Sequence, residues 1–269
     1  MDYSTITVTF GDQAENHVGM QKIGELADKG FTINELENAK INFEEKGAKC
    51  EFIKLNDYLP DKYKKIKDID QAAVLVIRNG VNIILLDNKS NKSKSDLMFD
   101  EQYKLNPDTK YFDTRRQKVL NKRARYNLCF ADEGQIADLE NNKGTIIAYK
   151  DVPLISKFRD ELKNYIGDKA ENLAAEGNYY YNIKKCGIGF HGDSERKKVI
   201  ALRLGATIPL HYHWYTKSNP IGDRVELDIN HGDIYIMSEK ATGFDWKKRS
   251  KVTLRHAAGS EKFLRVKNK

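Results

Sequence analysis

The pattern of hydrophobic and polar positions predicts mixed helices and strands in the first third of the chain. Residues 4–10 alternate between polar and hydrophobic side chains, which is typical of a half-buried strand. Residues 13–29 and 33–47 carry hydrophobic residues at helical spacing, and Thr32 and Asn34 are suitable caps near the start of the second segment. The sequence therefore predicts a small α+β unit in this region.

The clearest local prediction within this unit is a hairpin. The hydrophobic runs 73–77 and 81–86 flank Asn79-Gly80, and Asn-Gly between β-rich runs favours a tight type I′ turn. The polar segment 88–97 that follows is typical of an exposed loop or linker. We therefore expect a small α+β block in residues 1–95 and a second domain in residues 96–269.

Short strands dominate the prediction for the second domain, after one helix at residues 153–166. From residue 178 onward the β-rich runs are NYYYNI, KKVIALRLG, IPLHYHWY, RVELDI, GDIYIMS, KVTLR and KFLRVK. Turns separate these runs, and no long helix lies between them. This arrangement indicates a sandwich or a barrel and not a doubly wound sheet.

The composition agrees with a globular protein on the polar side of the usual range. Of the 269 residues, 40% are hydrophobic and 32% are charged. No run approaches the roughly 18 apolar residues that a membrane helix needs, and the first residues do not resemble a secretory signal. Cys50, Cys129 and Cys186 are too scattered for a disulfide framework or a cysteine zinc site, so we expect buried thiols in a reducing intracellular compartment, cytoplasm or nucleus.

A basic segment at residues 111–128 is a candidate binding surface for a polyanion. The net charge of +7 permits binding to a polyanion, and part of it is concentrated here. Cations that contact phosphates, next to aromatic rings that stack on bases, suit a strand of DNA or RNA. A solvated charged face is the alternative interpretation. The cations are Arg115, Arg116, Lys118, Lys122, Arg123 and Arg125, with Tyr111, Phe112 and Tyr126 beside them.

His191-Gly192-Asp193 is the motif with the most specific chemistry. On extended backbone, residues two apart share a face, so this imidazole and this carboxylate can both reach one metal ion. A further imidazole from elsewhere would complete a 2-His-1-carboxylate triad, which leaves positions open on Fe(II) for a co-substrate and O₂. The motif is short enough to occur by chance, so its context matters.

Four motifs in order resemble the AlkB-like branch of the Fe(II)/2-oxoglutarate dioxygenases. They are NYYYN at 178–182, GIGFHGDSE at 187–195, VIALRLGA at 199–206 and NHGDIYIM at 230–237. The resemblance covers roughly residues 175–267. As a whole the chain also resembles dioxygenases encoded by large DNA viruses, which would place it in a host cell. The resemblance implies a C-terminal double-stranded β-helix, or jelly roll, preceded by the small α+β block.

The resemblance also implies an oxidoreductase activity with Fe(II), 2-oxoglutarate and O₂. Many members hydroxylate or oxidatively demethylate a nucleobase, in nucleic acid modification or DNA repair. Others with this fold act on proteins or unmethylated bases, so the fold leaves the substrate open. The alternatives are therefore the same oxygenase chemistry on a protein or a small molecule, and a catalytically dead barrel that binds nucleic acid.

By this resemblance His191 and Asp193 are two metal ligands, and the later histidines are the candidates for the third. His256 has a spacing that suits the distal ligand, whereas His231 is the second choice, and the absence of a third protein ligand is the last alternative. Tyr181 is the best match for the tyrosine that contacts the co-substrate. An aromatic strand that packs in the core is the competing interpretation for the tyrosines.

An arginine is expected to hold the distal carboxylate of 2-oxoglutarate, because its planar fork pairs with a carboxylate. Arg265 follows His256 in an expected strand at 262–267, whereas Arg249 and Arg255 match the alternative pattern R-x5-R. The alternative interpretation for each of these residues is a surface arginine on an edge strand. Near the substrate, Trp214 with His211 and His213 could clamp a base, or they could pack in the barrel wall.

Overall fold

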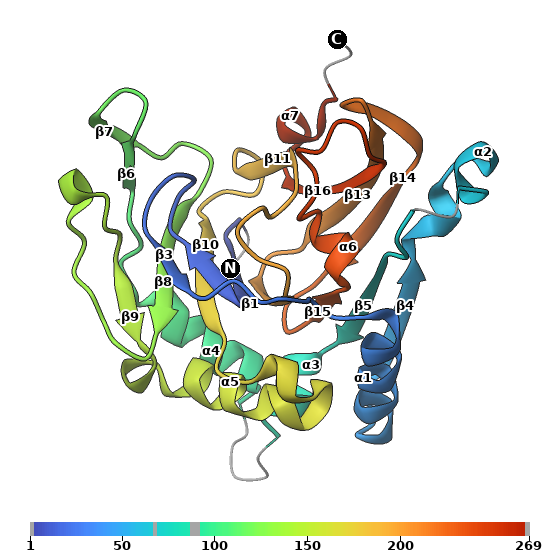
Figure 1. Ribbon diagram of the computed structural model, residues 1–269. Coiled ribbons are helices and arrows are strands. Elements are labelled where there is room, and N and C mark those ends of the chain that lie inside the picture. Colours follow the sequence, from blue (N-terminus) through green and yellow to red (C-terminus); the bar gives the residue numbers. More distant parts are fainter. Residues whose placement is uncertain (1–2, 67–68, 87–91, 267–269) are drawn as a thin grey trace.

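Two β-sheets organise the computed structural model, which describes residues 3–66, 69–86 and 92–266 and has an α+β fold (Figure 1). In spatial order, the larger sheet consists of β4 (Lys49–Lys54), β5 (Ala73–Arg78), β15 (Ile234–Met237), β12 (Val199–Gly205), β1 (Thr5–Gly11), β10 (Ala174–Tyr180), β8 (Tyr126–Ala131) and β9 (Ile146–Ala148). The smaller sheet consists of β11 (Gly187–His191), β16 (Thr253–Gly259), β13 (Ile208–Thr216) and β14 (Asn219–Ile229). Two hairpins, β2 (Gln13–Glu15) with β3 (Lys22–Gly24) and β6 (Lys110–Asp113) with β7 (Lys118–Asn121), complete the pairing.

Strand β1 lies inside the larger sheet, between β10 and β12. Thr7 is opposite Asn178 of β10 on one side and opposite Arg203 of β12 on the other. The alternation in the sequence explains this position, because Ile6, Val8 and Phe10 all pack into the main hydrophobic core while the threonines face the other way. The predicted strand is therefore confirmed, and it is a central strand.

The first 95 residues do not form a separate unit. Their strands β1, β4 and β5 belong to the same sheet as β10, β12 and β15, which come from the second half of the chain. The boundary that the polar segment suggested near residue 95 does not separate two sheets. Of that segment, residues 88–91 lie outside the described residues, and residues 94–97 begin a helix.

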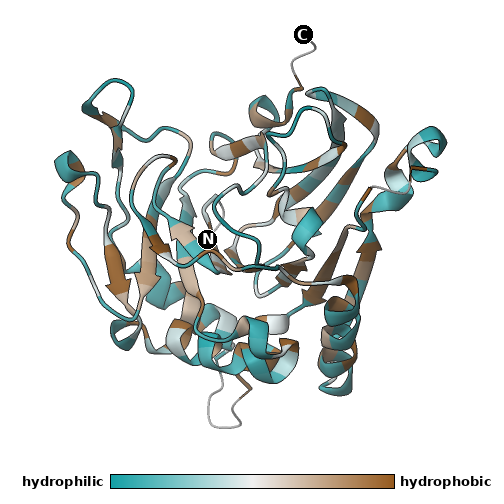
Figure 2. Cartoon of the chain, in the orientation of Figure 1, coloured by the Kyte–Doolittle hydropathy of each residue, from teal (hydrophilic) through white to brown (hydrophobic). Residues whose placement is uncertain are grey.

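Four helices, α1 (Ile33–Glu45), α3 (Gly80–Ile84), α4 (Lys94–Tyr103) and α5 (Pro153–Ile166), cover the face of the larger sheet that points away from the smaller one (Figure 1). Thr32 and Glu35 form a capping box at the start of α1, and α5 begins at a proline and ends before Gly167, so both predicted helices are confirmed. Figure 2 shows hydrophobic residues concentrated on the strands and hydrophilic ones on the surrounding helices and loops. The buried ring of Phe158, stacked on Phe10 at 5.4 Å, joins α5 to β1 in this core.

Two predictions for the first third are wrong. The helix expected at residues 13–29 is instead the β2–β3 hairpin, because Gly19 and Gly24 adopt positive φ angles of 89° and 82°, which a helix excludes. The hairpin expected at Asn79-Gly80 is a strand followed by α3. Asn79 does have the left-handed conformation that was expected, but its amide is held by Asp233 Oδ1 at 2.9 Å, and the chain then turns into the helix.

The remaining helices are short. They are η1 (Leu55–Tyr58), α2 (Asp61–Lys64), η2 (Leu139–Asn141), η3 (Tyr149–Asp151), η4 (Asp168–Ala170), α6 (Glu239–Thr242) and α7 (Glu261–Leu264). The strand expected at 262–267 is wrong, because its described residues belong to α7 and the segment after it. Across the described part of the chain, every helix is too short or too polar to traverse a lipid bilayer.

Candidate metal centre

A cavity of about 1050 Å³ lies between the inner faces of the two sheets. The larger sheet contributes Thr7, Tyr180 and Arg203, and the smaller sheet contributes Leu210 and His256. Because alternate residues of a strand face opposite sides, the larger sheet lines this space with every second position, as in Glu176, Asn178 and Tyr180 of β10. The cavity is therefore the place where polar residues of both sheets meet.

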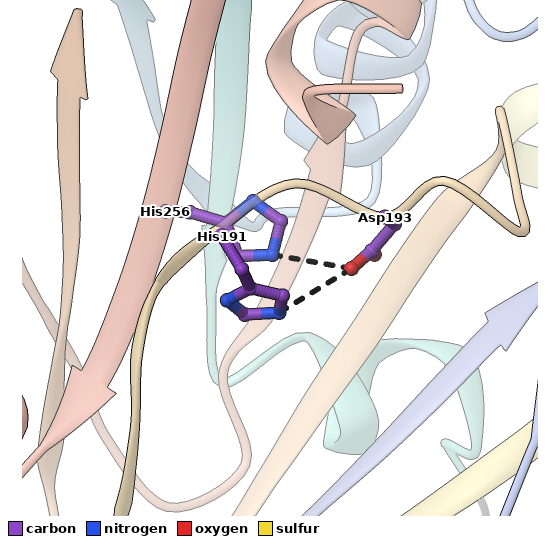
Figure 3. Close-up of side chains that lie close together, drawn as sticks. All are labelled: His191, Asp193 and His256. Carbon is purple, nitrogen blue, oxygen red and sulfur yellow. Dashed lines mark ion pairs between the residues drawn. The ribbon is translucent and has the colours of Figure 1, made fainter. Parts of the chain in front are cut away.

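Three side chains converge on one wall of the cavity (Figure 3). His191 at the end of β11 is the direct partner of His256 on β16, and Asp193 follows just after β11. Nε2 of His191 and Nε2 of His256 each lie 3.5 Å from Oδ1 of Asp193. One ligand atom from each of the three side chains lies within 4.8 Å of the other two, so together they could hold one metal ion.

The backbone around His191 and Asp193 fixes their orientation. Nδ1 of His191 lies 2.8 Å from the carbonyl oxygen of Gly189, and because a carbonyl only accepts, Nδ1 carries the proton and Nε2 is free to bind a metal. The amide of Asp193 donates to the carbonyl of Thr242, at the end of α6, at 2.9 Å. A Cβ on Gly192 would lie only 2.1 Å from the carbonyl oxygen of Gly243, so this close approach requires glycine.

The charges around the triad suit a divalent cation. Burial raises the pKa of Asp193, but His256, His191 and Arg196 outweigh this effect and hold it well below its ordinary value. Burial lowers the pKa of His256, against the opposing effect of Asp193. The donor set is therefore one ionised carboxylate and two imidazoles, of which His191 leaves Nε2 free for a metal.

Arg196 supports the carboxylate from behind. Its guanidinium lies 3.8 Å from Oδ2 of Asp193, 2.7 Å from Glu176 and 3.0 Å from Glu195, and its side chain is almost fully buried. Since Arg196 faces Oδ2, Oδ1 is the oxygen that faces the two histidines. Arg196 was not among the residues expected from the sequence, although a charged side chain three positions after Asp193 was a usable signal.

Comparison with known proteins gives one clear relationship. The chain is 44% identical over 261 residues to the uncharacterized protein R156 of Acanthamoeba polyphaga mimivirus, an alignment that covers 97% of this chain and 98% of the viral protein. The chain belongs to the family of this mimivirus protein. No family model matches the sequence. The name of the viral relative states no activity.

The three arginines expected to hold the co-substrate lie at the cavity, but none of them is deeply buried. Arg265 follows α7 with 73% of its side chain exposed, 3.8 Å from Glu261. Arg249 is exposed in the loop before β16. Arg255 packs over the ring of Tyr215 at 4.0 Å and near that of Trp246 at 5.2 Å.

Tyr181 does not line the cavity, whereas its neighbour Tyr180 does. The ring of Tyr181 stacks on Tyr126 at 4.8 Å, its hydroxyl donates to the carbonyl of Arg123, and 42% of the residue is exposed. A shift of one residue along an extended strand exchanges the two faces, and the run of three tyrosines gave no means to choose.

The expected base clamp is not assembled at the cavity. Trp214 is buried in the core between the sheets, where its indole donates to the carbonyl of Leu55 at 2.8 Å. His211 and His213 lie on the opposite face of β13, near Glu226 and the Gly222 carbonyl respectively. None of these three residues lines the cavity.

His231 is also outside the cavity and has a structural explanation. Its Nδ1 accepts a hydrogen bond from the amide of Gly205 at 2.9 Å, and its Nε2 lies 3.2 Å from Asp96. It therefore ties the end of β12 to α4. Of the two histidines considered for the third ligand, only His256 lies with His191 and Asp193.

The basic segment divides into exposed and inward-facing cations. Arg115, Arg116 and Arg123 are exposed on and after the β6–β7 hairpin, and Arg115 reaches the edge of the cavity. Lys122 is buried, its ammonium donates to Asn16 Oδ1 at 2.6 Å, and burial lowers its pKa to about 8. Arg125 donates to Asn178 inside the cavity. The exposed surface is thus smaller than the sequence indicated.

Proposed function

We propose that this protein is an Fe(II)- and 2-oxoglutarate-dependent dioxygenase, similar to the AlkB branch, that hydroxylates or oxidatively demethylates a nucleobase in DNA or RNA. The observation that carries the proposal is the convergence of His191, Asp193 and His256 on one wall of a large cavity. Two imidazoles and one carboxylate on a single face are the donor set of the non-haem Fe(II) oxygenases. With three protein ligands, such an ion keeps positions for a chelating co-substrate and O₂.

The arrangement of the sheets supports a double-stranded β-helix. A larger, mainly antiparallel sheet and a smaller antiparallel sheet face each other across the cavity, and neighbouring strands β11 and β16 of the smaller sheet carry the two histidines. This is the architecture that the resemblance to the dioxygenases implies. The part of the larger sheet between β12 and β10 is formed here by the N-terminal strand β1.

The residues present fit the metal and the co-substrate. His191, Asp193 and His256 would hold Fe(II), and Arg196 would keep the Asp193 carboxylate ionised and oriented. When bound, Fe(II) and 2-oxoglutarate supply the oxidising chemistry, in which O₂ places one oxygen atom in the substrate and one in succinate, with release of CO₂. The chain's own contribution is to fix the ligands at a cavity that residues of both sheets line.

The cations around the cavity favour an anionic polymer as the substrate. Arg115 reaches it from the β6–β7 side, while Lys247, Arg249 and Arg265 lie on the side of α6 and α7. Positive groups at the edge of a cavity suit phosphates, while the interior takes a base that has left its stack. The same chemistry on a protein or a small molecule, and a catalytically dead barrel, are the alternatives.

The cysteines and the viral relative support a location inside the host cell, in the cytoplasm or nucleus. Cys50, Cys129 and Cys186 are free thiols, of which Cys129 and Cys186 are buried and Cys50 is half-buried. Free thiols are typical of proteins in a reducing compartment.

The test is to load the protein with Fe(II) without oxygen, then add O₂, 2-oxoglutarate and oligonucleotides. Methylated and unmethylated DNA and RNA strands are compared, and succinate, formaldehyde and the modified base are measured. We expect succinate formation that depends on Asp193 and increases with a nucleic acid strand. Metal binding without succinate from any mixture would favour the catalytically dead barrel, and succinate formation indifferent to every strand would favour a protein or small-molecule substrate.

A further inference from the structure

Arg203 is a buried cation at the cavity and has no counter-ion among the described residues. It lies on β12, where its neighbours two and four positions earlier, Ala201 and Val199, face the interior between the sheets. The residue is 1% exposed. Its Nε and Nη1 atoms have no hydrogen-bond partner among the described residues, and no carboxylate of that part of the chain lies in ion-pair contact with it.

The acidic groups near Arg203 are engaged elsewhere. Asp233, at the start of β15, receives hydrogen bonds from Arg78 at 2.6 Å and from the amides of Asn79 and Asn230 at 2.9 Å each. Glu176 is held by Arg196 at 2.7 Å. An unpaired buried guanidinium is costly, because burial removes its hydration without supplying an anion.

A second unpartnered donor lies beside Arg203. Thr7 of β1 is its direct partner across the sheet, is only 4% exposed, and lines the same cavity. Its hydroxyl also lacks a hydrogen-bond partner among the residues that the structure describes. The Arg203 guanidinium and the Thr7 hydroxyl, on neighbouring strands of the larger sheet, therefore both face the cavity and are available to an anion.

The other arginines of the cavity are less suited to a buried anion. Arg196 is already paired with three carboxylates, and Arg125 donates to Asn178. Arg255 also has a buried Nε without a hydrogen-bond partner among the described residues, but the residue is only half-buried and its guanidinium packs against the rings of Tyr215 and Trp246. Arg249 and Arg265 are exposed. Arg203 is the arginine of this cavity that is both fully buried and without a protein counter-ion.

We propose that Arg203, assisted by the Thr7 hydroxyl, binds the distal carboxylate of 2-oxoglutarate, in place of the arginines expected from the sequence, Arg249, Arg255 and Arg265. This assignment rests on the proposed function and deepens it. A carboxylate accepts two parallel hydrogen bonds from a guanidinium, which suits a small dicarboxylate enclosed between the sheets. The phosphate backbone of a polymer does not suit a residue with this degree of burial.

The test compares two chelating acids on the Mn(II)-loaded protein by calorimetry. Both 2-oxoglutarate and 2-oxobutanoate carry the 2-oxo acid group, but only 2-oxoglutarate has a second carboxylate. We expect the parent protein to prefer 2-oxoglutarate, and Arg203→Met to lose at least about tenfold in affinity for 2-oxoglutarate while its affinity for 2-oxobutanoate is unchanged. Thr7→Val, which removes only the hydroxyl, should lose about two- to tenfold.

Arg265→Met and Arg249→Met are the matched controls, since they remove the same charge at the edge of the cavity. Retention of the preference for 2-oxoglutarate in a folded Arg203→Met variant, or its loss in Arg265→Met instead, overturns the assignment. We expect Arg203→Met to unfold at no lower temperature than the parent without ligand, because it removes an uncompensated buried charge.

A metal-free measurement separates this inference from the proposed function. Glutarate has both carboxylates but no chelating oxo group, and we expect it to raise the melting temperature of the parent protein and not of Arg203→Met. If the parent binds no metal while this difference persists, the dioxygenase proposal fails and the anion site stands. If the parent binds Mn(II) but its affinities for both 2-oxo acids are equal, the anion site fails and the metal centre stands.

Discussion

His191 and His256 are direct partners on the neighbouring strands β11 and β16, with their ring centroids 4.5 Å apart. The pairing of two strands that are distant in the sequence thus sets the separation of two proposed metal ligands. Because the sheet fixes both backbones, little reorganisation is needed when an ion binds.

The first prediction concerns the ligand set. We expect His256→Ala and Asp193→Ala to lower the affinity for Mn(II) or Fe(II) by more than about 100-fold, since each removes a donor and not merely a supporting group. Calorimetric titration of the metal-free proteins measures this. His231→Ala is the control and should bind the metal normally, because His231 contacts Gly205 and Asp96 away from the site. A full equivalent of bound metal in folded Asp193→Ala would contradict the assignment.

The second prediction tests the loop that carries Asp193. Gly192→Ala should displace this loop, because its Cβ would lie 2.1 Å from the Gly243 carbonyl oxygen. We expect about a 10- to 100-fold loss in metal affinity, similar to the loss of a supporting contact, with the fold retained. Gly134→Ala, whose nearest neighbours lie at 3.4 Å, is the control and should bind metal as the parent does. Equal affinities in both variants would show that the contact with α6 is unimportant.

The third prediction concerns nucleic acid. Replacing Arg115, Arg116 and Arg123 by alanine should weaken oligonucleotide binding and reduce the slope of log K against log salt by about one unit per lost phosphate contact. Fluorescence anisotropy at several salt concentrations measures both effects. A triple alanine variant of the exposed residues Lys46, Lys49 and Lys157, which do not line the cavity, has the same net charge and should retain the slope. An identical reduction in both variants would mean that only net charge matters.

The fourth prediction is a pH dependence of stability that arises at His17. Its ring stacks on Tyr111 at 3.6 Å, and burial, together with Lys122, lowers its pKa from 6.5 to about 4. Between those values the unfolded chain binds the proton and the folded protein does not. The contribution of the neutral His17 to the free energy of unfolding is therefore fully present above pH 6.5 and is lost as the pH falls towards 4.

Urea unfolding at intervals from pH 7 to pH 4 measures this effect. As the pH falls, the free energy of unfolding should decrease more steeply for the parent than for His17→Phe, by an amount that corresponds to the uptake of up to one proton on unfolding. Phenylalanine keeps a ring against Tyr111 but cannot titrate. Parallel curves for the two proteins would contradict the prediction.

Helices α1 and α5 and the metal motif were accessible from the sequence because their signals are local. The capping residue Thr32 and the proline that begins α5 mark helix starts, and His-x-Asp places two donors within three residues. Long-range pairing left no comparable signal. The sequence could rank His256 above His231 by spacing and resemblance, but their surroundings depend on which strands pair.

The same limit explains the co-substrate residues. Tyr180 and Tyr181 are chemically identical, and only the pairing of β10 with β1 determines which of them faces the cavity. Arg203 did carry a signal, as a charged residue within the hydrophobic run VIALRLG. Its significance depends on β1 as a neighbour, and that pairing joins residues from opposite ends of the chain.

The position of β1 also has a consequence for biosynthesis. Its residues leave the ribosome well before those of its neighbours β10 and β12, which begin only at residues 174 and 199. Until β10 and β12 have been synthesised, β1 lacks both of its neighbours in the sheet. Pairing β1 with strands so distant in the sequence requires the closure of a long loop, which slows folding. The protein should therefore acquire its cavity only after most of the chain has been translated. An N-terminal deletion that removes β1 would leave two facing strand edges open to aggregation in the nascent molecule.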